Sequence, residues 1–191
     1  MFLVRRPSPQ TIERFLQESR ELPLSYGKPG ILERAAVRGR HDQVLSPIGR
    51  GAADFEHARA GLSSWAHFEL GWVQLFPAAA PVAVGTVVAV LIRHLGFWSL
   101  NGCRITSVRG DDPWRFGFSY GTLPNHAEAG EELFEVFLDT ASDQVMYHIR
   151  AMSWPYAMLA HLGQPLVRVL QERFRRDSIA AMRRLMRDPI G

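Results

Sequence analysis

Six short runs of strand-forming residues, with only a few residues between them, constrain the fold of this chain more than any other feature of its sequence. The runs are rich in Val, Ile, Phe, Tyr and Thr, and they cover 72–76, 85–94, 101–108, 115–123, 131–139 and 144–153. Two parallel strands need a crossover of a dozen or more residues, usually a helix, and these spacers are too short for that. The pattern therefore predicts an antiparallel meander.

Helical patterns precede these strands. Ser8 followed by Pro9 is a favourable helix start, and the apolar spacing after it predicts a helix to about Leu22. After a loop-rich stretch, residues 43–48 form a candidate strand, whose proline indicates an edge position or a strand end. Residues 52–68 then repeat apolar side chains at the spacing of an amphipathic helix.

The last segment predicts a long helix that begins at Pro155, is interrupted at 163–165 and continues to about Arg187. Its apolar face consists of Leu166, Val169, Leu170, Phe174, Ala181 and Leu185. A curved antiparallel sheet of about six to seven strands around such a helix is the helix-grip arrangement, which can leave a ligand cavity between sheet and helix. We predict a single α+β helix-grip domain over 1–191, with an N-terminal helix and loop extension at 1–40 and the core at 41–191.

The composition is that of a folded protein, since 47% of the residues are apolar and 21% are charged. The longest apolar run, 78–92, is interrupted by Pro and Gly and falls short of the roughly 20 residues that a membrane span needs. No apolar stretch follows Arg5 and Arg6, so neither a secretory nor a twin-arginine signal is recognised. We expect a cytoplasmic protein whose lone cysteine, Cys103, is a buried and inert thiol.

The basic residues concentrate at the C-terminus, where 165–191 holds seven arginines against three acidic residues. This segment could bind nucleic acid or an acidic surface, but interleaved charges are more often a solvated helix face, and we expect no nucleic acid. Gly49-Arg50-Gly51 between a strand and a helix resembles a dinucleotide loop. However, Asp54 occupies the third small position and no parallel strand follows. We interpret the glycines as a tight turn and expect no cofactor.

Two neighbouring segments carry the candidate site residues. Residues 115–122 alternate so that Phe118, Tyr120 and Thr122 share one face, which should point inward. Tyr120 is either a core tyrosine or part of a pocket wall, and the strand does not choose between these. The turn after it carries His126, Glu128, Glu131 and Glu132.

The sequence allows three interpretations of that turn: a solvated loop, a set of acid–base or polar ligand contacts, or a metal site. Alternation sends Glu131 and Glu132 to opposite sides of a strand, so a compact ligand set would need outside help, and we expect no metal.

The last strand leaves the direction of its two faces open. Either the face with His148 and Arg150 or the face with Tyr147 points inward. If Arg150 lies at the polar end of the pocket, it should face Glu131 or Glu135 across neighbouring strands, because an isolated buried charge is expensive. The alternative is a half-exposed strand with a surface arginine.

The sequence resembles the DUF1990 family, also called UPF0548. The characteristic block is Arg-Phe-Gly-Phe-Ser-Tyr-Gly-Thr-Leu-Pro-Asn-His at 115–126, followed by Glu128, Gly130, Glu131, Glu132 and Phe134. Gly49-Arg50-Gly51, Trp98, Asn101 and Arg150-Ala151 agree in order. Gly102 and Trp154 depart from the pattern, where proline and arginine are expected. The resemblance implies a layout similar to START-like or Bet v 1-like proteins, which bind lipids and other apolar molecules. Some relatives of those proteins catalyse cyclisations.

Two functional hypotheses follow. The first is a binding module for a small apolar or amphipathic molecule, with ligand contacts from Trp98, Asn101, Phe118, Tyr120, Thr122 and Arg150. The second is an enzyme of the isomerase or cyclase type, in which Tyr120 orients a carbonyl substrate and His126 or Glu131 is the acid or base. The second hypothesis requires these three side chains to converge on one substrate.

Overall fold

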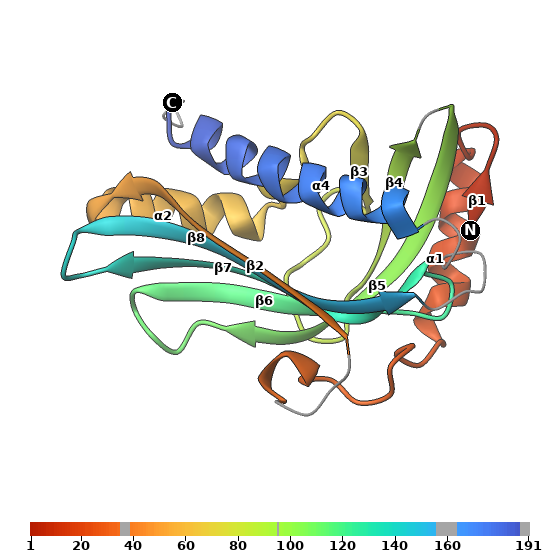
Figure 1. The fold of residues 1–191 in the computed structure, drawn as a ribbon, viewed down its shortest axis with the longest axis horizontal. Helices are drawn as coiled ribbons and strands as arrows, with labels where there is room; N and C mark the ends of the chain where they lie inside the picture. Colours follow the sequence, from red (N-terminus) through yellow and green to blue (C-terminus); the bar gives the residue numbers. More distant parts are fainter. Residues whose placement is uncertain (35–38, 95, 156–163, 188–191) are drawn as a thin grey trace.

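The computed structural model describes residues 1–34, 39–94, 96–155 and 164–187. One eight-stranded antiparallel sheet curves around the C-terminal helix (Figure 1). Its strand order is β2-β8-β7-β6-β5-β4-β3, and β1 pairs with β5. The strands are β1 (Phe2–Leu3), β2 (Arg40–Arg50), β3 (Val73–Phe76), β4 (Val87–His94), β5 (Phe97–Arg109), β6 (Arg115–Thr122), β7 (Glu128–Asp139) and β8 (Gln144–Pro155). The predicted α+β helix-grip class is confirmed.

The outer face of the sheet packs against α1 (Pro9–Arg20) and the segment 23–34. Helix α1 starts as predicted, since the Ser8 hydroxyl accepts a hydrogen bond from the Thr11 amide. Ile12 and Phe15 bury the helix against β4 and β5. Segment 23–34 contains the short helix η1 (Ile31–Glu33), which lies against β7 and β8.

The inner face packs against α2 (Gly51–Ser63), the short helix η2 (Ala66–Phe68) and α4 (Gln164–Leu185). The predicted helix 52–68 is two elements, because the chain takes a left-handed conformation at Trp65, with φ 65°, and turns there. The Trp65 indole donates to the Ala80 carbonyl at 2.8 Å. This break places the aromatic side chain of Phe68 over the sheet.

Strand β2 lies at the edge of the sheet, as its proline predicted, and the register shifts between Pro47 and Gly49. Gly51 then opens α2 with φ 73°, so the Gly-Arg-Gly turn is a helix entry as interpreted. Strand β7 begins at Glu128 rather than Glu131, so Glu128 also belongs to the strand and not to the preceding turn.

Helix α4 covers the inner face with Leu170, Phe174 and the fully buried Met182. Val169 does not belong to this face, since it is 60% exposed. The helix predicted to start at Pro155 does not start there, because Pro155 pairs with Glu128 as the last residue of β8. Residues 156–163 lie outside the described residues, and the helix itself ends near the predicted position. Within the part of the chain that the structure describes, no helix is long and apolar enough to cross a membrane.

Candidate functional site

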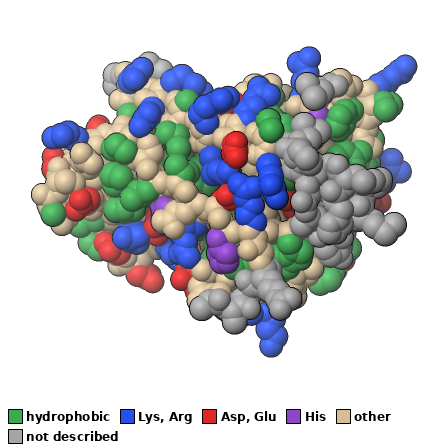
Figure 2. All heavy atoms as spheres, viewed as in Figure 1, with side chains coloured by type: hydrophobic (Ala, Val, Ile, Leu, Met, Phe, Trp, Pro, Cys, Tyr) green, Lys and Arg blue, Asp and Glu red, His purple; other side chains and the backbone are tan. Residues whose placement is uncertain are grey.

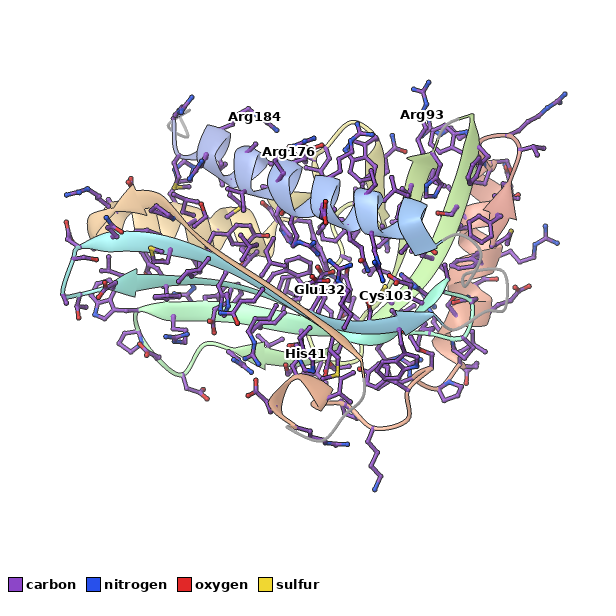
Figure 3. All side chains as sticks on the ribbon, in the orientation of Figure 1. His41, Arg93, Cys103, Glu132, Arg176 and Arg184 are labelled. Atoms are coloured by element: carbon purple, nitrogen blue, oxygen red, sulfur yellow. The ribbon has the colours of Figure 1, made fainter. Side chains whose placement is uncertain are left out.

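A cavity of about 440 Å³ lies between the inner face of the sheet and α4. Its walls are mostly apolar and aromatic, and polar side chains interrupt them along the floor formed by β5 to β8. Figure 3 shows Glu132 between the sheet and α4, with its side chain in this space. The apolar and aromatic wall includes Phe68, Trp72, Val90, Ile92, Leu170 and Phe174.

Glu132 forms a partly buried, hydrogen-bonded pair with Tyr120. The two residues are directly opposite on β6 and β7, and the Tyr120 hydroxyl donates to the Glu132 carboxylate at 2.8 Å. Burial raises the pKa of Glu132 to about 7, although the Tyr120 hydrogen bond and the Arg175 guanidinium oppose this shift. Burial and the neighbouring carboxylate raise the pKa of Tyr120. Glu132 therefore changes its charge near neutral pH.

Glu128 forms a second polar contact, which ties α4 to the sheet. The Gln171 side-chain amide on α4 donates to Glu128 at 2.7 Å and to the Ser153 hydroxyl at 3.2 Å. Burial is the main cause of a raised pKa at Glu128, and the hydrogen bonds from Gln171 and Ser153 oppose it. Hydrogen bonds from Gln171, as well as apolar packing, therefore hold the helix over the cavity.

Arg175 of α4 is a basic residue that lines the cavity. It contacts Asp42 of β2 at 3.5 Å, and Asp42 also pairs with Arg40 at 2.9 Å. Other arginines of α4 lie on its outer side, where Figure 3 labels Arg176 and Arg184. Figure 2 shows this side of the molecule with basic groups in blue and acidic groups in red among them.

Other predicted residues also lie in the cavity wall. His126 lines it, and its Nδ1 accepts a hydrogen bond from the Glu128 amide at 2.9 Å. Burial lowers the pKa of His126 to about 4, so the imidazole is neutral at pH 7. Asn101 donates to the Val90 carbonyl and the Ser99 hydroxyl, and the Thr122 hydroxyl bonds the backbone of Gly130.

Four predicted positions require correction, because these residues do not present their side chains to the cavity. Phe118 is a core residue against Trp65, with ring centroids 4.8 Å apart. Trp98 packs with the outer cluster beside α1. Glu131 borders the cavity, but its carboxylate points to the outer face, where it accepts hydrogen bonds from the Gly30 and Ile31 amides and from the Thr106 hydroxyl.

Arg150 is the fourth correction. It lies on the outer face and donates to the Leu32 carbonyl at 2.8 Å, with Glu33 at 3.5 Å. It therefore does not face Glu131 or Glu135. Glu135 pairs with Arg115 at 2.7 Å instead. The reason is that segment 23–34 covers the outer face and supplies closer acceptors than the neighbouring strand.

The convergence required by the enzyme hypothesis is thus only partly present. Tyr120 and His126 line one cavity, but the carboxylate beside them belongs to Glu132 and not to Glu131. Cys103 is fully buried and free, and burial raises the pKa of its thiol. In the described ranges, no cluster of three or more His, Cys, Asp or Glu side chains could hold a metal ion.

Comparison with known sequences decides the family. Residues 33–181 match the family described as "Domain of unknown function (DUF1990)". The chain belongs to the DUF1990 family. A UPF0548 protein of Dictyostelium discoideum is 34% identical over 203 residues, covering 95% of this chain and 94% of that protein. One from Deinococcus radiodurans is 33% identical over 186 residues, covering 91% and 92%.

Solved structures share the fold of this DUF1990 chain at low sequence identity. A protein from Arthrobacter aurescens has a TM-score of 0.51 and 12% identity, with 79% of this chain and 88% of that one covered. Norcoclaurine synthase from Thalictrum flavum, in complex with dopamine and hydroxybenzaldehyde, has a TM-score of 0.50 and 9% identity, with 85% and 95% covered. These similarities show that the chains share the helix-grip fold.

Sequence reasoning did not single out Glu132, Gln171 or Arg175 as residues that line the cavity. Glu132 belongs to the quoted DUF1990 block, and pairing its strand with the inward face of Tyr120 would have selected it over Glu131. Gln171 and Arg175 are four residues apart and so share one face of α4. That spacing was a usable signal, although the arginine resembled the solvated ones around it.

Proposed function

We propose that this DUF1990 protein binds a small apolar or amphipathic molecule in the cavity between the sheet and α4. The observation that carries the proposal is a cavity of about 440 Å³ with apolar walls and a localised set of polar groups. Ligand sites in proteins typically combine these two properties, because apolar surface supplies affinity and a few polar groups fix orientation. Tyr120 and Glu132 would orient the polar end of the ligand.

The fold neighbours are consistent with this proposal. Norcoclaurine synthase, whose structure contains dopamine and hydroxybenzaldehyde, holds small aromatic molecules in a protein of the same general shape. At 9% identity this similarity concerns the shape of the chain alone. The argument for ligand binding therefore rests on the cavity itself.

A cavity-filling variant tests the proposal. Ala151 lines the cavity directly opposite Glu132, so Ala151→Met should occupy part of the ligand space. Native mass spectrometry of the purified parent protein should show a bound small molecule, and a screen of apolar compounds should raise its melting temperature. In the variant both signals should weaken, and the apparent affinity for the ligand should fall at least about tenfold, a loss of roughly 1.4 kcal/mol in binding free energy.

Ala141→Met is the matched control, since Ala141 is exposed in the turn between β7 and β8. The control should keep the parent's ligand signals. If no compound binds the parent, or if the control loses binding as strongly as Ala151→Met, the proposed function is wrong.

A second function is favoured by one observation, the pKa of about 7 at Glu132 beside the Tyr120 hydroxyl. A carboxyl group that titrates near the working pH is well suited to proton transfer. Under this proposal Glu132 takes a proton from the carbon next to a ligand carbonyl. The expected result is exchange of that proton for deuterium with a bound ketone, lost in Glu132→Gln. Exchange at the parent rate in that variant would contradict it.

A further inference from the structure

The polar end of the cavity has an excess of acidic groups. Among the described lining residues, Glu128 and Glu132 direct carboxylates into this region, and Arg175 is the basic partner nearby. Arg175 and Arg40 both contact Asp42, so the two guanidinium groups face the three carboxyl groups of Asp42, Glu128 and Glu132, and Asp42 raises the pKa of both glutamates. His94 and His126 also line the cavity, and burial lowers the pKa of both imidazoles. The local charge therefore favours a cation over an anion.

Glu132 has unused capacity for hydrogen bonds. A carboxylate offers about four acceptor positions, and within the described ranges only the Tyr120 hydroxyl donates to this one. An ionised carboxylate in a desolvated site is expensive unless a cation and further donors complete its environment. A ligand with several N–H donors and a positive charge would supply both.

Aromatic rings line the same cavity as this carboxylate. The Phe68 ring centroid lies 6.3 Å from that of Tyr120 and 5.1 Å from that of Phe174, and all three residues line the cavity. A cation is attracted to the faces of aromatic rings, most strongly where water is excluded. The same rings accommodate the apolar body of an amphipathic molecule. The aromatic rings are an observation separate from the acidic residues, and they also favour a ligand with a positive charge and an apolar body.

We infer that the cavity selects amphipathic amines, with the ammonium group bound between the Glu132 carboxylate and the rings of Phe68, Tyr120 and Phe174. This inference rests on the proposed binding function and specifies its ligand class. The ammonium donates hydrogen bonds to Glu132, and the hydrocarbon part occupies the space under α4. An anionic amphipath of the same shape is rejected by Glu128 and Glu132.

The pH dependence of binding should follow the charge of Glu132. The charged or titratable groups around it are Tyr120 on β6, Glu128 on β7, Arg175 on α4, Asp42 on β2, Cys103 on β5 and Tyr147 on β8. Because Glu132 has a pKa of about 7, it gains its negative charge as the pH rises through neutrality. A primary amine, with a pKa of about 10 as in lysine, stays charged over this range. Amine affinity should therefore rise between about pH 6 and pH 8.

A matched set of three probes tests this inference by isothermal titration calorimetry. Phenylpropylamine, phenylpropanol and phenylpropanoate share one apolar body and differ in the charge of the head group. The parent protein should bind the amine at least about tenfold more tightly than the alcohol, as for a hydrogen bond to a charged group, and the anion most weakly. Glu132→Gln should remove the preference for the amine and leave alcohol binding unchanged.

Two further variants make the result specific. Tyr120→Phe keeps the ring and removes the hydroxyl, so it should retain the preference for the amine. Glu56→Gln removes a carboxylate from the exposed surface of α2 and should change nothing. Equal binding of amine and alcohol by the parent, or an amine preference that survives Glu132→Gln, overturns the inference while the cavity remains a binding site. Binding of none of the probes, together with a failed compound screen, overturns the proposed function as well.

Discussion

Replacing His67 by leucine is expected to remove a large part of the protein's sensitivity to acid. His67 is fully buried in η2 among aromatic rings, 4.6 Å from Phe134 and 5.7 Å from Trp65 between ring centroids. Within the described residues, neither of its ring nitrogens has a hydrogen-bond partner. Burial lowers its pKa from 6.5 to about 3.

The sign of the effect follows from proton binding. Below pH 6.5 the unfolded chain binds a proton at His67 that the folded protein does not bind until about pH 3, so acid favours unfolding over this interval. Between pH 6.5 and pH 4.5 this one histidine should reduce the free energy of unfolding by about 2–3 kcal/mol. Leucine has a similar volume and no proton to bind.

Urea unfolding at about pH 7 and pH 4.5 measures the difference. His67→Leu should also be more stable at pH 7, because it removes two unpartnered polar atoms from the core, each worth roughly 1–3 kcal/mol. His41→Leu, at an exposed position on β2, is the control and should follow the parent. A variant at position 67 that loses as much stability in acid as the parent would contradict the assignment. His126, with a pKa of about 4, leaves a residual dependence.

The antiparallel sheet could be predicted because its information is local. Alternation and short spacers identify the strands without knowledge of their neighbours, and the inward face of β6 with Tyr120 and Thr122 was predicted correctly. Strand ends were less certain: β7 starts three residues early at Glu128 because pairing with β8 extends it. No local pattern indicated this extension.

The choice between the two faces of β8 depended on distant residues. Arg150 and Tyr147 alternate, and the sequence alone allowed either to face the helix. The structure turns Tyr147 inward, where its hydroxyl lies 2.9 Å from that of Ser178 on α4. Segment 23–34, more than 100 residues earlier in the chain, covers Arg150 on the outer face. Contacts over this sequence distance have no periodic signature, so the site could be predicted only in part.

The directions of the adjacent residues Glu131 and Glu132 also depend on distant parts of the chain. Because one points to the outer face and the other into the cavity, replacing each should have a different effect on stability. Glu131→Ala should destabilise the fold by about 3–5 kcal/mol, because it removes the shared acceptor of three donors and each buried unsatisfied donor costs roughly 1–3 kcal/mol. Its carboxylate, 4% exposed, accepts from the Gly30 amide at 3.0 Å, the Ile31 amide at 2.8 Å and the Thr106 hydroxyl at 2.7 Å. The two amide contacts hold segment 23–34 to β7, together with the packing of Ile31 and Leu32 against Leu133, and alanine leaves the donors buried without an acceptor.

Glu132→Ala is the matched comparison, because it makes the same chemical change one residue later on the same strand. There the lost group is a desolvated carboxylate with one described donor, in a cavity rather than in packed protein, so the cost should stay below about 1 kcal/mol. Urea unfolding at pH 7 measures both variants. Amide hydrogen exchange at Gly30 and Ile31 should accelerate only in Glu131→Ala. Equal losses of stability in the two variants would show that Glu131 does not hold segment 23–34 to the sheet. They would also remove the physical basis for assigning a structural role to Glu131 and ligand binding to Glu132.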